Sequence, residues 1–129
     1  MARHTYFPDR GDFIHIDFSP SAGHEEAGGH YGLVLSTASF SKATGHALIC
    51  PITSRIRGWP LEVIVRKGLL PLKQGAAVDS VVLTYQMKSL DFRERGVAYI
   101  SKAPDDVLDE TLEKIRAILD SDDVIEEFD

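Results

Sequence analysis

Only one stretch of this chain, close to its end, has a strong helical pattern, and this restricts the fold more than any other feature. Within residues 104–119, apolar side chains recur on one helical face. They are Leu108, Leu112, Ile115 and Leu119. Pro104 fits the first turn of a helix, and Asp105 and Asp106 complement the positive end of the helix dipole. We therefore expect a helix here that packs one apolar face onto a sheet.

The segments before this helix have strand patterns, separated by polar or glycine-rich breaks. Strands are expected at residues 11–18, 33–35, 46–52, 61–65 and 97–101, with a long or bent strand at 78–90. Residues 36–45 suit a turn or one short helical turn, and Pro51 predicts an edge or a bulge. Several strands followed by one helix predict an α+β domain, mainly β, built as a small curled antiparallel sheet or barrel.

A polar, glycine-rich loop leads directly into the apolar strand 33–35, and we expect the function at this junction. Residues 23–32 include four glycines, two histidines and two glutamates. Glycine permits backbone conformations that other residues resist, so such a loop can present polar groups at the rim of a rigid sheet. A second polar loop, residues 53–60, follows the next strand. Two loops that carry potential functional groups thus flank the central strands.

The composition fits one compact domain whose body is electrically neutral. The chain has 129 residues, of which 43% are hydrophobic and 26% are charged. Its formal charge is -6, but six acidic residues and no basic ones follow Leu119. Residues 1–119 therefore carry 14 acidic and 14 basic side chains. A local basic patch that binds nucleic acid is compatible with this balance.

The sequence gives no signal for a membrane span, a secretory leader or a metal site. No apolar run approaches the roughly 18 residues that a membrane helix needs, and the N-terminus lacks a signal-peptide core, so a cytoplasmic protein is expected. The five histidines have no paired zinc-type spacing, so no metal is expected. The single cysteine, Cys50, is expected to be a small buried side chain.

Short motifs follow one another in a specific order from residue 11 onward. They are Gly11-Asp12, Asp17-Phe18-Ser19-Pro20, Gly23 to Ser36, Thr44-Gly45, Pro51-Ile52-Thr53-Ser54, Arg57 to Val63 and Lys88 to Arg95. This ordered set resembles the MazF/PemK (Kid) family of toxin endoribonucleases. The resemblance implies an SH3-like barrel of mostly antiparallel strands with a C-terminal helix, usually a homodimer. It spans residues 11–119, and we expect residues 1–119 to form a single domain and residues 120–129 to add an acidic C-terminal tail.

The same resemblance implies the toxin of a type II toxin–antitoxin system, which cleaves single-stranded RNA at selected sequences without a metal or another cofactor. The implied partners are RNA and a cognate antitoxin with an acidic tail. For catalysis it points to Thr53, which the family keeps, to His30 at the family's arginine position, and to Glu25 at its glutamate. The expected RNA-binding residues are Tyr31, Ser54, Arg55, Arg57 and Gln86.

The histidine at position 30 leaves more than one function open. An imidazole transfers protons well near neutral pH, but it lacks the permanent charge and the bidentate grip with which a guanidinium holds phosphate. Either Arg55 or Arg57 supplies that charge, or catalysis has been lost and the chain is a binding module for antitoxin, RNA or another protein. A third interpretation follows the gyrase-poisoning toxins that share this fold.

Several of these positions also have a purely structural interpretation. Thr53 can bind a phosphate oxygen or cap the end of its strand. The aromatic side chains can stack an RNA base or simply pack. They are Tyr31, Trp59 and Tyr85. The tail 120–129 can be solvated, or it can dock on the RNA groove and restrict access, as its mixture of acidic and apolar residues suggests.

Overall fold

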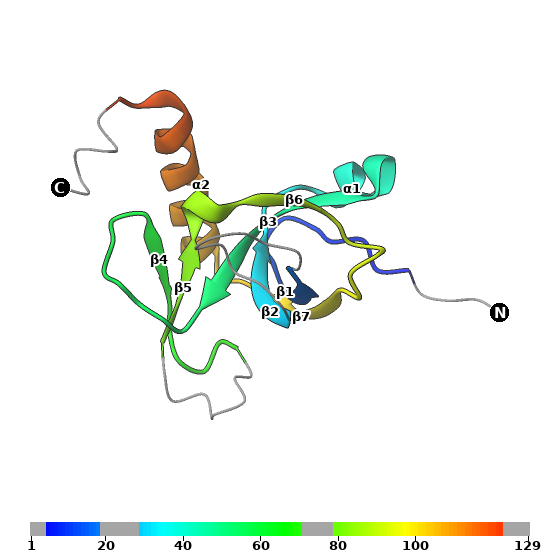
Figure 1. Ribbon diagram of the computed structural model, residues 1–129, viewed down its shortest axis with the longest axis horizontal. Coiled ribbons are helices and arrows are strands. Elements are labelled where there is room, and N and C mark those ends of the chain that lie inside the picture. Colours follow the sequence, from blue (N-terminus) through cyan, green and yellow to red (C-terminus); the bar gives the residue numbers. More distant parts are fainter. Residues whose placement is uncertain (1–4, 19–28, 71–78, 123–129) are drawn as a thin grey trace.

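The computed structural model describes residues 5–18, 29–70 and 79–122, which form a curled sheet with one long helix against it (Figure 1). In chain order the elements are β1 (Asp12–Asp17), β2 (Gly29–Val34), α1 (Ala38–Thr44), β3 (His46–Thr53), β4 (Glu62–Val65), β5 (Ser80–Leu83), the 3-10 helix η1 (Thr84–Gln86), β6 (Lys88–Asp91), β7 (Ala98–Lys102) and α2 (Asp105–Asp120). This is the α+β, mainly β class that the sequence predicts.

Seven strands form one sheet, and every strand pair within the described residues is antiparallel. The pairing order is β4-β5-β3-β2-β1-β7, and β6 pairs with β3 beside this path. Among the strands described, the end strands β4 and β7 do not pair with each other, so the sheet forms an open barrel. The predicted antiparallel, barrel-like fold with a C-terminal helix is confirmed, although the barrel is not closed.

The long strand predicted for residues 78–90 is divided by η1. β5 pairs with the last two residues of β3, and β6 pairs with its first four. Thr84 of η1 is buried, and its hydroxyl donates to the carbonyl oxygen of Leu61 at 2.6 Å. Pro51 lies in the part of β3 that pairs with neither β5 nor β6. Because proline has no N–H to donate, this gap in a central strand tolerates it, instead of the predicted edge or bulge.

Two hydrophobic clusters occupy the two faces of the sheet, because successive side chains of a strand point to opposite faces. On β1, Phe13 belongs to the first cluster and Ile14 to the second. Helix α2 covers the first cluster with the apolar stripe that the sequence predicts. The stripe residues in contact are Leu108, Leu112 and Ile115. Leu119 was expected to pack as well but is 74% exposed, because α2 extends past the sheet before its last turn (Figure 1).

Helix α1 has a defined beginning and end, which makes it more than a turn. The hydroxyl of Thr37 accepts a hydrogen bond from the Phe40 N–H at 3.3 Å, the usual N-cap arrangement. At the other end, Gly45 adopts φ 74° and donates its N–H to the Ser41 carbonyl. In Figure 1, α1 lies at the opposite end of the molecule from β4.

A buried carboxylate fastens the N-terminal segment to β1 and β7. Asp12 accepts hydrogen bonds from the Tyr6 hydroxyl and the Asp9 N–H, and it forms an ion pair with Lys102 at 2.7 Å. Burial, reinforced by the bond to Asp12, raises the pKa of the Tyr6 hydroxyl. The bond to Asp12 likewise raises the pKa of Lys102. We call Tyr6, Asp9, Asp12 and Lys102 the N-terminal cluster, and it gives the Gly-Asp motif a structural role.

Candidate functional site

His30 and Thr53, which the sequence singles out for catalysis, lie at the same end of the sheet. Tyr31 of β2 is paired with Ile52 of β3. The same antiparallel register, continued by one position, sets His30 opposite Thr53. Cross-strand neighbours share one face of a sheet, with Cβ atoms about 4.5–5.5 Å apart. Both side chains are partly exposed. The register therefore brings the predicted catalytic pair together at the rim.

Gly32 allows β2 and β3 to approach each other closely beside this pair. A Cβ atom at this position would lie 2.6 Å from Cγ2 of Ile49 and 3.3 Å from the Cys50 carbonyl oxygen. The Ile49 methyl group belongs to a stiff, β-branched side chain that is fully buried, so it has little room to move. A larger residue at position 32 would therefore disturb the packing between the strands that carry His30 and Thr53.

The hydroxyl of Thr53 also shapes the loop that follows β3. Its Oγ1 accepts a hydrogen bond from the backbone N–H of Arg55 at 3.1 Å, an arrangement typical of a threonine that turns the chain. The capping role that the sequence allowed is therefore present. A hydroxyl that accepts one bond still has its proton to donate. Thr53 can thus hold the loop and donate to a phosphate oxygen at the same time.

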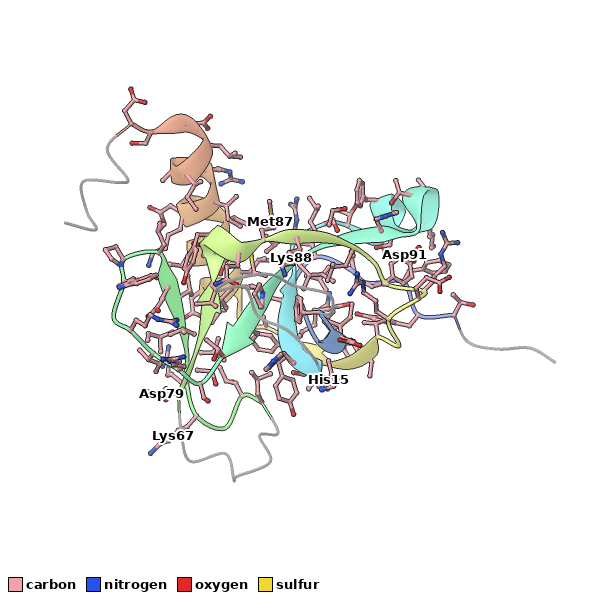
Figure 2. The ribbon with its side chains drawn as sticks, in the orientation of Figure 1. His15, Lys67, Asp79, Met87, Lys88 and Asp91 are labelled. Carbon is pink, nitrogen blue, oxygen red and sulfur yellow. The ribbon has the colours of Figure 1, made fainter. Side chains whose placement is uncertain are left out.

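Tyr31, which was predicted to bind RNA, lies on the opposite face of the sheet from His30. Tyr31 is paired with His15 of β1, and their rings are 5.4 Å apart in an edge-to-face arrangement. Its ring also packs against the hydrophobic cluster under α2. Figure 2 shows His15 near the end of β2. The sequence did not single out His15, and it shares the face of Tyr31, away from His30.

Three of the predicted RNA-binding residues line one pocket of about 470 Å³, together with two aromatic residues. We call this the cationic-aromatic pocket. Its lining residues are Arg55, Arg57, Trp59, Tyr85 and Gln86. The guanidinium carbon of Arg57 lies 5.4 Å from the Trp59 ring centre, a cation–π contact, and the Trp59 and Tyr85 rings are 5.6 Å apart. Ser54, also predicted, is exposed and does not line the pocket.

Glu62 holds one wall of this pocket in place, a role that sequence analysis missed. Glu62 is 5% exposed, and its carboxylate accepts hydrogen bonds from the backbone N–H groups of Arg57 at 3.2 Å and of Gly58 at 2.9 Å. Gly58 adopts φ 77°, a left-handed conformation that favours glycine. The sequence signal for this role is that Glu62, a charged residue, begins a strand of β-branched residues. A carboxylate at such a position can accept hydrogen bonds from the loop that precedes the strand.

The remaining predicted features are a third catalytic residue, the absence of a metal and a buried cysteine. Glu25 lies outside the described residues, so its role stays a prediction. Within residues 5–18, 29–70 and 79–122, no group of three or more potential ligand side chains is placed to hold a metal. Burial raises the pKa of the Cys50 thiol to about 12, and the residue is the small buried side chain that the sequence predicts. None of the described helices is long and apolar enough to span a membrane.

The fold and this surface define a small open-barrel protein that presents a histidine, a threonine and two arginines around one end of its central strands. A family model described as the PemK-like, MazF-like toxin of type II toxin–antitoxin systems matches residues 9–119. The chain belongs to this family. The family that the ordered motifs predict is therefore confirmed.

Individual relatives agree with this assignment. The endoribonuclease toxin MazF of Escherichia coli (strain K12) is 38% identical over 91 residues, which cover 70% of this chain and 75% of that protein. The crystal structure of MazF (Form-I) from Deinococcus radiodurans has a TM-score of 0.76 at 41% identity, covering 89% of this chain and 98% of the other. A MazE–MazF structure (Form-II) from the same organism has a TM-score of 0.70 at 36% identity, covering 90% and 98%.

Proposed function

We propose that the protein is an endoribonuclease toxin, which cleaves single-stranded RNA at selected sequences in the cytoplasm without a metal. The observation that carries the proposal is the register that sets His30 opposite Thr53, next to the cationic-aromatic pocket. The relative from Escherichia coli that carries the name endoribonuclease toxin supports it. Single-stranded RNA is favoured because exposed aromatic rings can stack only on bases that are not already paired.

The reaction needs a proton acceptor and a group that stabilises the charge developing on phosphorus. The ribose 2′-oxygen forms a new bond to the neighbouring phosphorus while the bond from phosphorus to the 5′-oxygen breaks. His30 accepts the proton of the 2′-hydroxyl, and Thr53 donates a hydrogen bond to a phosphate oxygen. The leaving 5′-oxygen takes a proton from water, which gives a 2′,3′-cyclic phosphate and a 5′-hydroxyl. Glu25 remains a candidate for orienting His30.

A permanent positive charge beside the phosphate is supplied by the loop after β3. Arg55 follows Thr53 by two residues, and its backbone is tied to the Thr53 hydroxyl. Among the described residues, no carboxylate forms an ion pair with Arg55 or Arg57. Their charges are therefore available to phosphate. His30 thus transfers the proton and an arginine of the loop supplies the charge, and together they replace the arginine that the family carries at position 30.

The protein partners in this proposal are a second copy of the chain and an antitoxin. The family description names a toxin–antitoxin system, and the related structure from Deinococcus radiodurans contains MazE with MazF. An antitoxin with an acidic tail would neutralise the two free arginines and cover the RNA groove. Light scattering of the purified protein measures the predicted homodimer, and inhibition of cleavage by the product of a neighbouring acidic reading frame measures the second partner.

The alternative function is a binding module that has lost catalysis. One observation favours it: the Thr53 hydroxyl is used to cap the turn at Arg55, which gives the threonine a structural reason to be present. The histidine at position 30 would then have only a structural role at the rim of the sheet. Both functions use the same surface, so only the fate of the RNA distinguishes them.

Cleavage of a long single-stranded RNA in the presence of EDTA tests the proposal. The parent is compared with His30→Ala, Thr53→Ala, Thr53→Ser and His30→Arg over a range of pH. We expect defined cleavage sites with the parent, strong loss in both alanine variants, and substantial activity in Thr53→Ser, which keeps the hydroxyl. A contaminating nuclease would survive in every variant, so the alanine variants serve as the purification control.

Two outcomes would decide for the alternative. If the parent is inert while His30→Arg cleaves, the scaffold is intact and its catalysis has been lost. If the parent binds RNA without cleaving it and His30→Arg is equally inert, the protein is a binding module whose site cannot be restored at this position. Activity of the parent that depends on EDTA-removable metal would contradict the metal-independent mechanism.

A further inference from the structure

The cationic-aromatic pocket exposes two large aromatic side chains that a folded protein usually buries. Trp59 is 42% exposed and Tyr85 is 36% exposed. The planes of their rings are inclined at 47°, so the rings are not stacked flat against each other. Both therefore keep apolar surface directed toward the pocket. Exposed aromatic surface at the wall of a pocket is a common property of ligand-binding sites.

Both walls of the pocket are held by hydrogen bonds from buried residues and are therefore formed before any ligand arrives. On the Trp59 side, the buried Glu62 carboxylate fixes the loop, and the Glu62 N–H donates to the Trp59 carbonyl at 3.0 Å. On the Tyr85 side, the hydroxyl of buried Thr84 donates to the carbonyl of Leu61. Because Leu61 directly precedes Glu62, the two walls are fixed to each other. Preorganisation of this kind lowers the entropic cost of binding.

The charge of the pocket selects the class of ligand. Arg55 and Arg57 are exposed and have no ion-pair partner among the described residues, although the chain as a whole has a formal charge of -6. A ligand that carries both a flat ring and a neighbouring negative charge satisfies both halves of the pocket. A nucleotide unit of a single strand has this combination, since each base is joined to a phosphate.

We propose that this pocket binds one unpaired RNA base by stacking it on Trp59 and Tyr85, while Arg55 and Arg57 hold the adjoining phosphates. The proposal rests on the proposed function for its ligand class. It adds a base-binding subsite beside the reaction site. The subsite is built from Trp59 and Tyr85, for which the sequence allowed either packing within the protein or stacking on an RNA base. Gln86, at the same wall, has an amide that can distinguish base edges.

The experiment uses a probe that the chain already contains. Trp59 is the only tryptophan, so the intrinsic tryptophan fluorescence reports on this pocket alone. The protein is titrated with a short, mixed-sequence RNA whose 2′-hydroxyls are methylated, because this RNA cannot undergo the cleavage reaction. A matched series replaces one base at a time by an abasic unit, which keeps the backbone charge. We expect saturable quenching that is lost when one particular position becomes abasic.

Variants test the two aromatic walls separately. Affinity is measured by the anisotropy of a labelled RNA, so that the tryptophan can be changed. We expect Trp59→Leu and Tyr85→Ala each to weaken binding by about 5- to 100-fold, the usual range for loss of one base–aromatic stack. Tyr85→Phe keeps the ring and should bind as the parent does. Phe40→Ala is the matched control, because Phe40 is 37% exposed but lies on α1, away from the pocket.

The outcomes separate this proposal from the proposed function. Base-dependent quenching without cleavage of natural RNA would support the subsite and contradict the endoribonuclease. A second outcome would overturn the subsite and leave the endoribonuclease standing. In it, the parent cleaves natural RNA, binds every abasic oligonucleotide as tightly as the intact one, and has the same RNA affinity as Tyr85→Ala. The third arm is a peptide of the acidic sequence 120–129. If the peptide quenches Trp59 and the RNA does not, the pocket is a protein-docking site and the proposal is wrong.

Discussion

The N-terminal cluster and the cationic-aromatic pocket contain the same kinds of residues, aromatic rings and charged side chains, but they differ in how those charges are matched. In the cluster, the side chain of Asp12 is 3% exposed and is satisfied by Lys102, Tyr6 and a backbone N–H. In the pocket, Arg55 and Arg57 are exposed and have no ion-pair partner among the described residues.

This difference indicates which group serves stability and which serves binding. A buried carboxylate with a full set of partners is costly to disrupt, and its removal is felt by the whole fold. Exposed cations without partners cost little to remove, but any anionic ligand loses them. Loss of a cluster residue should therefore lower the free energy of unfolding and leave RNA affinity intact. Loss of an arginine of the pocket should leave the free energy of unfolding unchanged and weaken RNA binding.

The largest expected effect is on stability, from Asp12→Ala. The substitution leaves the Tyr6 hydroxyl and the Asp9 N–H without their acceptor, and it removes the nearer of the two carboxylates that form ion pairs with Lys102. We expect the free energy of unfolding in urea to fall by about 3 kcal/mol, the upper end of the range for leaving a hydrogen-bonding group without its partner. RNA affinity, measured where the variant is still folded, should equal that of the parent. An unchanged urea midpoint would show that this cluster does not stabilise the fold.

Glu62→Ala tests the one residue that belongs to both categories, since it is buried and also supports the pocket. Removing a carboxylate that accepts the N–H groups of Arg57 and Gly58 should cost about 2 kcal/mol of unfolding free energy. It should also weaken RNA binding, because the Trp59 wall loses its anchor. Glu62→Gln keeps one acceptor oxygen and should lie between the parent and Glu62→Ala in both measurements. Weakened stability with unchanged RNA affinity would separate Glu62 from the pocket.

Arg55→Gln and Arg57→Gln should change binding and not stability. We expect the free energy of unfolding to stay within about 0.5 kcal/mol of the parent value, as for most surface substitutions. The slope of log affinity against log salt concentration should shrink by about 0.7 for each arginine that contacts a phosphate of single-stranded RNA. Arg116→Gln, an exposed position on α2 outside the pocket, is the charge-matched control. Equal slopes in all three variants would remove the arginines from the RNA interface.

The sequence predicted most of the fold, because the main elements depend on patterns that are local. The alternation of β1 and the apolar stripe of α2 are visible within single segments, and both elements form where they were expected. The division of residues 78–90 was not predictable in this way. It depends on a hydrogen bond from Thr84 to Leu61, a residue distant in the sequence, and such a contact leaves no periodic signal.

The roles of the candidate site residues stay predictions, but the sequence did not show that Tyr31 and His30 lie on opposite faces of the sheet, and this has a specific cause. Strand β2 was expected to begin at Leu33, but it begins at Gly29. A strand that includes residues 29–32 alternates its side chains through them, which directs His30 and Tyr31 to opposite faces. The pair formed by Trp59 and Tyr85 was missed for another reason. A loop and a 3-10 turn meet there through tertiary contacts, so no spacing in the sequence could have joined them.

The smallest expected effect distinguishes the two regions by pH. The pKa of Lys102 is raised by its bond to Asp12, and that of Tyr6 by burial and by Asp12. Groups with raised pKa values contribute stability that is complete below their unfolded values, about 10 for both, and that is lost as pH rises through the folded values. The free energy of unfolding should therefore decline as the pH rises above about 10, measured by urea titration at each pH.

Variants of the N-terminal cluster should flatten this alkaline decline. Tyr6→Phe removes one of the two titrating groups and Lys102→Met the other, so each variant should start from a lower stability at neutral pH and lose less of it on going to alkaline pH. Phe40→Ala carries no titrating group and should follow the slope of the parent. If the parent and all three variants decline equally steeply, the alkaline sensitivity arises outside the N-terminal cluster. The contrast between the cluster, whose charges are paired, and the pocket, whose arginines have no ion-pair partner among the described residues, would then depend on the urea and salt measurements alone.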